Sequence, residues 1–296
     1  MPTAPQRLLP IIQQSFIQTP LTFSDLPQFR QQLSAGLNKY SSVYNSVFLG
    51  AQAATPGMAF LSGYQNTIRC LDDDCPADAL AAFCVSEKGV KKPWAMTSQL
   101  TELEQGYALT GQKAYVMLLP NELDRLYVIA KNGQQLTCVF FSAGVKGLTT
   151  TSPLKAPFIE DIPHSGVRFD NVLISESQLM PMDGHQGANK PFRYWEDVHV
   201  SLAMMAWMAR AAYENGKALD QLAPLTEQMS QLIKSFEKHP NYYFAESFSL
   251  LDQSQDILEF HSKYLSVNSQ KDWQKDRLLL QMGQKIRRLV SAKMSL

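Results

Sequence analysis

Two carboxylates and a histidine lie close together in an apolar stretch of the C-terminal third of the chain. They are Glu196, Asp197 and His199, and the apolar residues around them recur at helical spacing: Phe192, Trp195, Val198, Leu202, Met205 and Ala209. A carboxylate buried in such surroundings has a raised pKa and can act as a general base. The alternative is a solvated carboxylate in the first turn of a helix, where the helix dipole favours negative charge. For His199 the alternative is a structural role, as a polar residue whose hydrogen bonds are satisfied where two helices pack together.

The composition excludes several classes of function. The 296 residues carry 27 Lys and Arg against 27 Asp and Glu, so no net field attracts a nucleic acid. Cys70, Cys75, Cys84 and Cys138 form no Cys-x-x-Cys pair and have no histidine at metal-ligand spacing, so we expect free thiols and no metal. The longest nearly charge-free helical stretch, Val200–Ala209, is about half the length that spans a bilayer. Since the N-terminus resembles no export signal, we expect a cytoplasmic protein without a membrane span.

The first 75 residues have helical periodicity. Ser24 and Asp25 precede a predicted helix that carries Phe29 and Leu33 at four-residue spacing, and a second helical stretch covers residues 44–71. From residue 79 to about 181, short β-rich runs alternate with turns. These runs are Ala82–Ser86, Ala95–Leu103, Tyr107–Thr110, Lys113–Met117, Asp124–Ala130, Thr137–Ser142, Gly147–Ser152 and Val167–Ile174.

Many short strands without helices between them indicate an antiparallel barrel or sandwich. After residue 190 the periodicity is helical again, over 190–217, 224–238, 242–265 and 270–293. The predicted fold class is therefore α+β, in three domains. They are a helical N-terminal domain at 1–78, a central antiparallel β domain at 79–185 and a C-terminal helical bundle at 186–296.

Three stretches of the β region resemble the acyl-CoA dehydrogenase family. The first, Ala81–Gly89, resembles the apolar strand that enters a Thr/Ser-Glu-Pro-Gly loop, and the second, Gly106–Val116, resembles a Gly-Tyr-x-Leu-x-Gly-x-Lys hairpin. The third combines Gly147–Thr149, Gly166–Ile174 and Asp183–Gly187, which resemble the closing strand, its turn and the lead into the first bundle helix. The three occur in family order and spacing, so we identify the chain as a short, motif-degenerate relative of this family.

The resemblance implies a flavoprotein that removes hydrogens from the α and β carbons of acyl-CoA or a related acyl thioester and transfers the hydride to FAD. Ser86 falls on a flavin hydrogen-bond donor and Tyr115 on the aromatic that stacks against the flavin. The usual position of the base falls near Gln284, which has no basicity. The less common position, on the first bundle helix, falls on Asp197 or Glu196, and the ungapped alignment prefers Asp197.

Several departures from the family pattern favour a second interpretation. After Glu87 the chain loses one glycine and the hydroxyl residues, Met117 replaces a hydroxyl residue, and Phe158-Ile159-Glu160 puts bulk and negative charge where a small residue and a cation are usual. No Arg-x-x-Phe-Gly motif and no Gly-Gly pair occur. The alternative is therefore a degenerate homologue that binds an acyl thioester or a partner subunit without dehydrogenation.

The C-terminal helices suggest two further contacts. Between Lys271 and Lys293, seven basic residues stand against two acidic ones, a face that could meet a CoA or pyrophosphate group. The alternative is a solvated helix with Leu278, Leu279, Met282, Ile286, Leu289 and Val290 packed inward. Because Val200–Ala209 is apolar on nearly every face, we also expect a homodimer or homotetramer formed through these helices.

Overall fold

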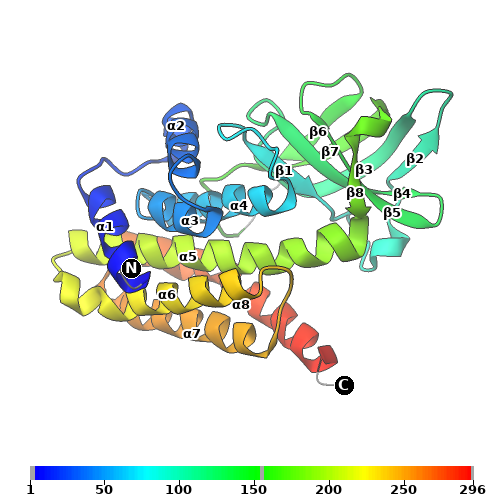
Figure 1. Ribbon diagram of the computed structural model, residues 1–296. Coiled ribbons are helices and arrows are strands. Elements are labelled where there is room, and N and C mark those ends of the chain that lie inside the picture. The colour runs from blue at the N-terminus through cyan, green and yellow to red at the C-terminus, as the bar shows by residue number, and fades with distance from the viewer. Residues whose placement is uncertain (1–3, 154–156, 295–296) are drawn as a thin grey trace. The chain divides into compact units, whose positions relative to one another are not determined.

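A computed structural model of the chain describes residues 4–153 and 157–294 (Figure 1). Its contacts define two compact units. A helical unit combines Met1–Cys70, Pro157–Asp161 and Tyr194–Leu296, and a β unit combines Leu71–Ala156 and Ile162–Arg193. Within the described residues, every helix is too short or too polar to cross a membrane.

The helices follow the predicted order. Their bounds are α1 Ala4–Phe16, α2 Leu26–Leu37, α3 Ser42–Gly50, α4 Pro56–Leu71, α5 Lys190–Glu214, α6 Ala223–Lys238, α7 Ala245–His261 and α8 Val267–Met294. The cap of α4 is Thr55, whose hydroxyl accepts a hydrogen bond from the Met58 N–H at 3.1 Å. Helix α5 follows a π-helical turn at Gly184–Asn189. The Asp183 carboxylate caps this turn by accepting hydrogen bonds from the His185 and Gln186 N–H groups.

Glycines let two helices approach α5 closely. A Cβ atom on Gly63 of α4 would lie 2.6 Å from Val200 Cα, and one on Gly50 of α3 would lie 2.3 Å from the Ala203 carbonyl oxygen. The facing atoms belong to the backbone of α5, which cannot move aside without repacking the helix. The contact therefore fixes where α3 and α4 cross α5.

We expect Gly63→Ala to destabilise the protein by about 1–3 kcal/mol, as overpacking does. The sign of this stability change is informative, because a glycine-to-alanine change inside an ordinary helix stabilises the helix by about 1 kcal/mol. Urea unfolding measures the difference, with Ser249→Ala on the exposed side of α7 as the control. A neutral or stabilising Gly63→Ala would contradict the close contact.

A buried arginine joins the ends of three helices of this unit. The Arg210 guanidinium on α5 donates to the carbonyl oxygens of Ser15 at 2.9 Å, Ala51 at 3.0 Å and Gln18 at 2.5 Å, and it pairs with Glu214 at 2.7 Å. Carbonyls at the carboxyl ends of helices lack intrahelical partners. Arg210 supplies those partners for the ends of α1 and α3.

The apolar stretch Val200–Ala209 is buried within the single chain, and its most exposed member, Ser201, shows only 6% of its surface. The expectation that a short bundle leaves this stretch uncovered is therefore wrong. The subunit number stays a prediction without this support.

The β unit is one eight-stranded sheet. Its strands are β1 Ala81–Cys84, β2 Gln99–Glu102, β3 Tyr107–Met117, β4 Arg125–Asn132, β5 Gln135–Ser142, β6 Leu148–Pro153, β7 His164–Ile174 and β8 Leu179–Asp183. The strand order is β6-β7-β3-β2-β4-β5-β8, with β1 paired to β4. A mostly antiparallel sheet between helical segments confirms the predicted α+β class.

Two strand pairs correct the expectation of a purely antiparallel sheet. β1 pairs in parallel with residues 125–128 of β4, and β2 pairs in parallel with residues 131 and 132 of the same strand. The two short strands therefore follow one another along β4. Residues 85–98, which connect them, leave the sheet as a loop.

Candidate functional site

The predicted flavin contacts Ser86 and Tyr115 are brought together at the base of the 85–98 loop. The Ala114 N–H donates to the Ser86 carbonyl oxygen at 2.8 Å, which places Ser86 beside the residue before Tyr115. β3 has an irregular register between Lys113 and Val116, and Tyr115 in this bulge has a φ of 59° with 66% of its surface exposed. A left-handed conformation is costly for a tyrosine and persists only where the surroundings impose it. The bulge thus exposes an aromatic ring on the residue that follows the backbone contact to Ser86.

A buried ion pair that the sequence analysis did not predict fastens this loop to β3. The Glu87 carboxylate accepts from the Thr97 N–H at 2.6 Å, the Thr97 hydroxyl at 2.8 Å, the Ser98 N–H at 3.0 Å and the Lys113 ammonium at 2.9 Å. Lys113 also donates to the Val85 carbonyl oxygen at 3.1 Å. Both side chains are buried, 0% exposed for Lys113 and 2% for Glu87. One carboxylate thus ties both ends of the loop to the strand that carries the bulge.

The surroundings of this pair stabilise the ionised carboxylate of Glu87. Burial alone would raise the pKa of Glu87, but hydrogen bonds from Thr97, Lys113 and Ser98 outweigh it and lower the pKa to about 2. Burial lowers the pKa of Lys113, and the Glu87 carboxylate opposes this shift. The loop anchor is therefore a desolvated ion pair whose hydrogen bonds compensate for burial.

The loop itself is basic and carries an exposed aromatic residue. Lys88, Lys91 and Lys92 are all exposed, and Trp94 has 63% of its surface exposed. Gly89, with a φ of 80°, allows the turn between them. The segment in which the resemblance to the family pattern lacks a glycine and hydroxyl residues thus offers ammonium groups instead.

Asp197, the preferred candidate base, lies in a polar network inside the helical unit. Its carboxylate accepts a hydrogen bond from the Tyr243 hydroxyl and pairs with an Arg287 guanidinium nitrogen at 3.4 Å. Arg287 also reaches Asp252 at 3.4 Å, and Asp252 accepts from the Gln284 side chain at 3.4 Å. Gln284 and Asp197, the two positions that the family resemblance gave for the base, are therefore linked through two residues. Glu196, the second candidate, is half-buried on the preceding position of α5.

His199 is a satisfied polar residue of the core. Its Nδ1 donates to the Trp195 carbonyl oxygen at 2.7 Å, so its Nε2 accepts from the Ser42 hydroxyl at 2.9 Å. The Cys70 sulfur lies 3.7 Å from the same nitrogen. Complete burial lowers the pKa of His199 to about 4, so the ring is neutral at physiological pH.

The segment Phe158-Ile159-Glu160, expected to be unusual for its bulk and charge, packs against helices of its own unit. Ile159 is buried, and its N–H donates to the Asp276 carboxylate on α8 at 2.6 Å, while Glu160 pairs with Lys275. Asp161 accepts from the Thr55 hydroxyl at the start of α4 at 2.5 Å. The bulky side chain is thus a core residue and the negative charges are paired or hydrogen-bonded.

Asp276 gives a pH-dependent prediction. Burial raises the pKa of Asp276 to about 6 from 3.8, and Asp161 adds to the rise, although the Ile159 N–H opposes it. The folded state then binds this proton more tightly than the unfolded state, so the contribution of Asp276 to stability falls as pH rises from about 4 to about 6 and is level above that. We expect Asp276→Asn to match the wild type near pH 4 and to exceed its stability by up to about 3 kcal/mol at pH 7.

Urea unfolding at several pH values measures this difference. Asp272→Asn, on the exposed side of the same helix, is the matched control. A constant difference between Asp276→Asn and the wild type across this pH range would be inconsistent with the raised pKa.

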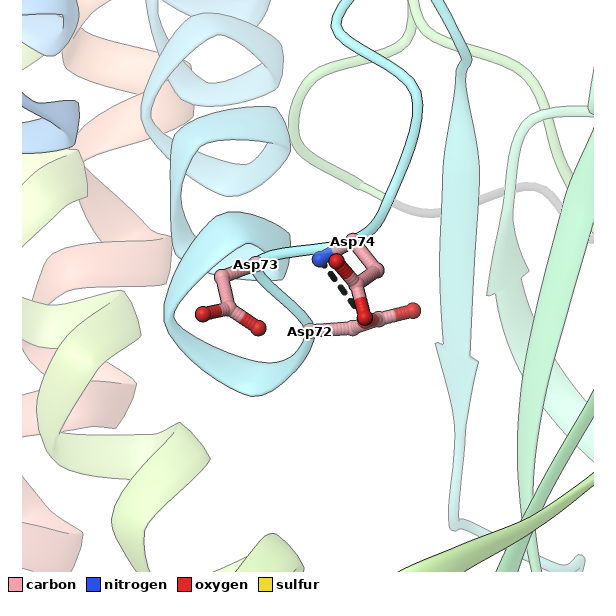
Figure 2. A group of neighbouring side chains, drawn as sticks. All are labelled: Asp72, Asp73 and Asp74. Carbon is pink, nitrogen blue, oxygen red and sulfur yellow. Dashed lines mark hydrogen bonds between the residues drawn. The ribbon is translucent and has the colours of Figure 1, made fainter.

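Asp72, Asp73 and Asp74 form an acidic group after α4 (Figure 2). Asp72 accepts from Arg125 at 2.9 Å and from the Tyr127 hydroxyl at 2.5 Å, and its second oxygen accepts from the Asp74 N–H at 3.1 Å. These contacts attach the start of the β unit to β4. We assign no ligand to this group.

Comparison with known proteins identifies the fold. No family model matches the sequence. No curated protein matches it significantly. Among solved structures, the prolyl acyl carrier protein oxidase AnaB is similar at a TM-score of 0.71 and 14% identity, over 98% of this chain and 97% of that one.

Two further structures extend this similarity. Butyryl-CoA dehydrogenase from Megasphaera elsdenii is similar at a TM-score of 0.67 and 12% identity, over 98% of this chain and 99% of that one. PigA with FAD and proline is similar at 0.62 and 14% identity, over 94% and 91%. The order of elements is therefore shared along almost the whole chain at low identity, and the chain has the acyl-CoA dehydrogenase fold.

Proposed function

We propose that the protein binds FAD and catalyses the α,β-dehydrogenation of an acyl thioester. The observation that carries the proposal is the strained, exposed Tyr115 beside Ser86, at the positions that the resemblance gives for flavin contacts. The fold it shares with butyryl-CoA dehydrogenase and with PigA, which has been solved with FAD, supports the same conclusion. Backbone strain at an exposed residue is typical of functional sites.

The residues of the β unit fit this cofactor. The Tyr115 ring offers a stacking surface, the Ser86 hydroxyl is a hydrogen-bond donor, and Lys88, Lys91 and Lys92 offer positive charge to a diphosphate. The ion pair Glu87–Lys113 fastens the loop that carries Ser86 and the lysines to β3, the strand that carries Tyr115. When bound, FAD supplies the acceptor for the substrate hydride.

The chain itself supplies the proton acceptor. We assign this role to Asp197, with Glu196 as the second candidate, and the acceptor removes the α-proton while the β-hydride leaves with its electron pair and a carbon–carbon double bond forms. The Tyr243 hydroxyl and Arg287 hold the Asp197 carboxylate in one orientation. Orientation by fixed neighbours is what a general base requires of its surroundings.

Anaerobic mixing of the FAD-loaded protein with acyl-CoA thioesters of several chain lengths tests the proposal. We expect at least one thioester to bleach the absorbance band of the oxidised flavin and to yield the α,β-unsaturated product. Retention of FAD with no bleaching by any thioester would contradict dehydrogenation and favour the second function below.

The second candidate function is a homologue that binds an acyl thioester or a partner subunit without dehydrogenation. Two observations favour this function. Met117, which stands in place of a hydroxyl residue, is buried, and the Asp197 carboxylate is paired with Arg287. Such a protein would bind acyl-CoA in calorimetry but leave it unchanged. Light scattering separately tests the expected homodimer or homotetramer.

A further inference from the structure

Helix α8 exposes its apolar side. Leu278, Met282, Ile286 and Leu289 have 41%, 49%, 41% and 66% of their surfaces exposed. Their spacing of four, four and three residues places them on one side of the helix, and we call this set the α8 stripe. The expectation that these residues pack inward is therefore wrong.

Polar contacts on the opposite side fix this orientation. The buried positions of α8 include Trp273, Asp276, Gly283 and Arg287. Asp276 binds the Ile159 N–H, and Arg287 pairs with two carboxylates of α5 and α7. Rotation of α8 to bury the stripe would break these buried polar contacts, each of which is costly to leave unmade. The uncovered apolar side is thus a consequence of how the helix is held.

Unpaired cations lie beside the stripe. Lys271, Lys285 and Arg288 are exposed, and none has a hydrogen-bond or ion-pair partner among the described residues. Against them the exposed positions of α8 carry a single acidic residue, Asp272. Figure 1 shows the C-terminal turns of α8, in red, at the edge of the helical unit. The stripe and its cations therefore form an accessible, basic and apolar surface.

We propose that the α8 stripe with Lys271, Lys285 and Arg288 is a docking surface for an acidic amphipathic helix of a partner protein. Such a helix presents apolar residues at three- and four-residue spacing to the stripe and carboxylates to the cations. Charge distinguishes this partner from a second copy of the chain. An antiparallel pair of α8 helices would double the positive charge and add only another Asp272 to balance it.

The proposal is independent of the flavin chemistry, so it is tested on the full chain with defined probes. One probe is a fluorescent helical peptide of about 18 residues, five turns, with leucines along one side and glutamates on both flanks. A control peptide keeps the leucines and has lysines in place of the glutamates. Fluorescence anisotropy measures the binding of each peptide at low and high salt.

We expect saturable binding of the glutamate peptide and none of the lysine peptide at the same concentrations. High salt should weaken the binding at least tenfold, since exposed charges are screened. The double variant Lys285→Glu/Arg288→Glu should lose binding of the glutamate peptide and gain binding of the lysine peptide. Met282→Ser should weaken binding of the glutamate peptide. These positions lie on the surface, and circular dichroism checks that the variants stay folded.

Three outcomes would overturn the proposal. Equal binding of both peptides, or of neither, would show that charge does not select an acidic helix. Self-association of the wild type that Met282→Ser abolishes in light scattering would assign the stripe to a second copy of the chain. Sedimentation with phosphatidylserine vesicles without binding of the glutamate peptide would assign it to a lipid surface.

Discussion

Replacement of Asp197 by Asn is expected to lower the turnover of the FAD-loaded protein on its acyl thioester by about a hundredfold or more. Asparagine keeps the shape of the side chain and can still accept a hydrogen bond from the Tyr243 hydroxyl. The change therefore removes basicity with little effect on geometry. FAD binding should stay unchanged, because the predicted flavin contacts Ser86 and Tyr115 lie in the other unit.

Glu196→Gln is the matched control for this experiment. It removes a carboxylate from the neighbouring position of the same helix, where the side chain is half-buried. A large loss in Glu196→Gln but not in Asp197→Asn would move the role by one residue. Unchanged turnover in both variants would exclude α5 as the source of the base.

Glu87→Gln is expected to destabilise the β unit by about 3–5 kcal/mol, the usual loss when one partner of a buried ion pair is removed. The Lys113 side chain, with none of its surface exposed, would be left as an uncompensated buried charge. Urea unfolding followed by circular dichroism measures the loss. Glu102→Gln, at an exposed position of β2, is the control and should change stability by less than about 0.5 kcal/mol.

The pH dependence of this difference follows from the lowered pKa. A carboxyl group whose folded pKa is below its unfolded value stabilises the protein above the unfolded value and loses that effect as pH falls through the folded one. For Glu87 the window runs from 4.5 down to about 2. The gap between the wild type and Glu87→Gln should thus be constant near neutral pH and narrow below about pH 4.5. A gap that widens in acid would contradict the ion pair.

Local sequence patterns predicted most of the elements, and the misses have local causes. The prolines near the N-terminus hid α1, which contains Pro10. β8 is five residues long and contains Pro181, so it carries little strand signal. β3 was predicted as two runs because Gly111 interrupts the pattern, but the strand continues through the bulge at Tyr115. Periodicity is a short-range signal, and short or bulged elements weaken it.

The candidate site was predicted only as far as single residues. The motifs located Ser86 and Tyr115, and the structure brings them together. The sequence did not pair Glu87 with Lys113, which are 26 residues apart, because the contact depends on how β1, β2 and β3 assemble. The partners of Asp197 and the outward stripe of α8 were missed for the same reason: periodicity defines a face of a helix and not what that face meets.

In the proposed flavoprotein, the β unit holds FAD against Tyr115 and Ser86. The most direct test is to incubate the purified full chain with FAD, remove free flavin by gel filtration and record the absorbance spectrum beside that of Tyr115→Ala. We expect a yellow wild-type protein with a stoichiometric flavin band and a Tyr115→Ala variant that retains clearly less flavin. A wild-type protein that stays colourless after this treatment, or a variant that retains FAD as well as the wild type, would contradict it.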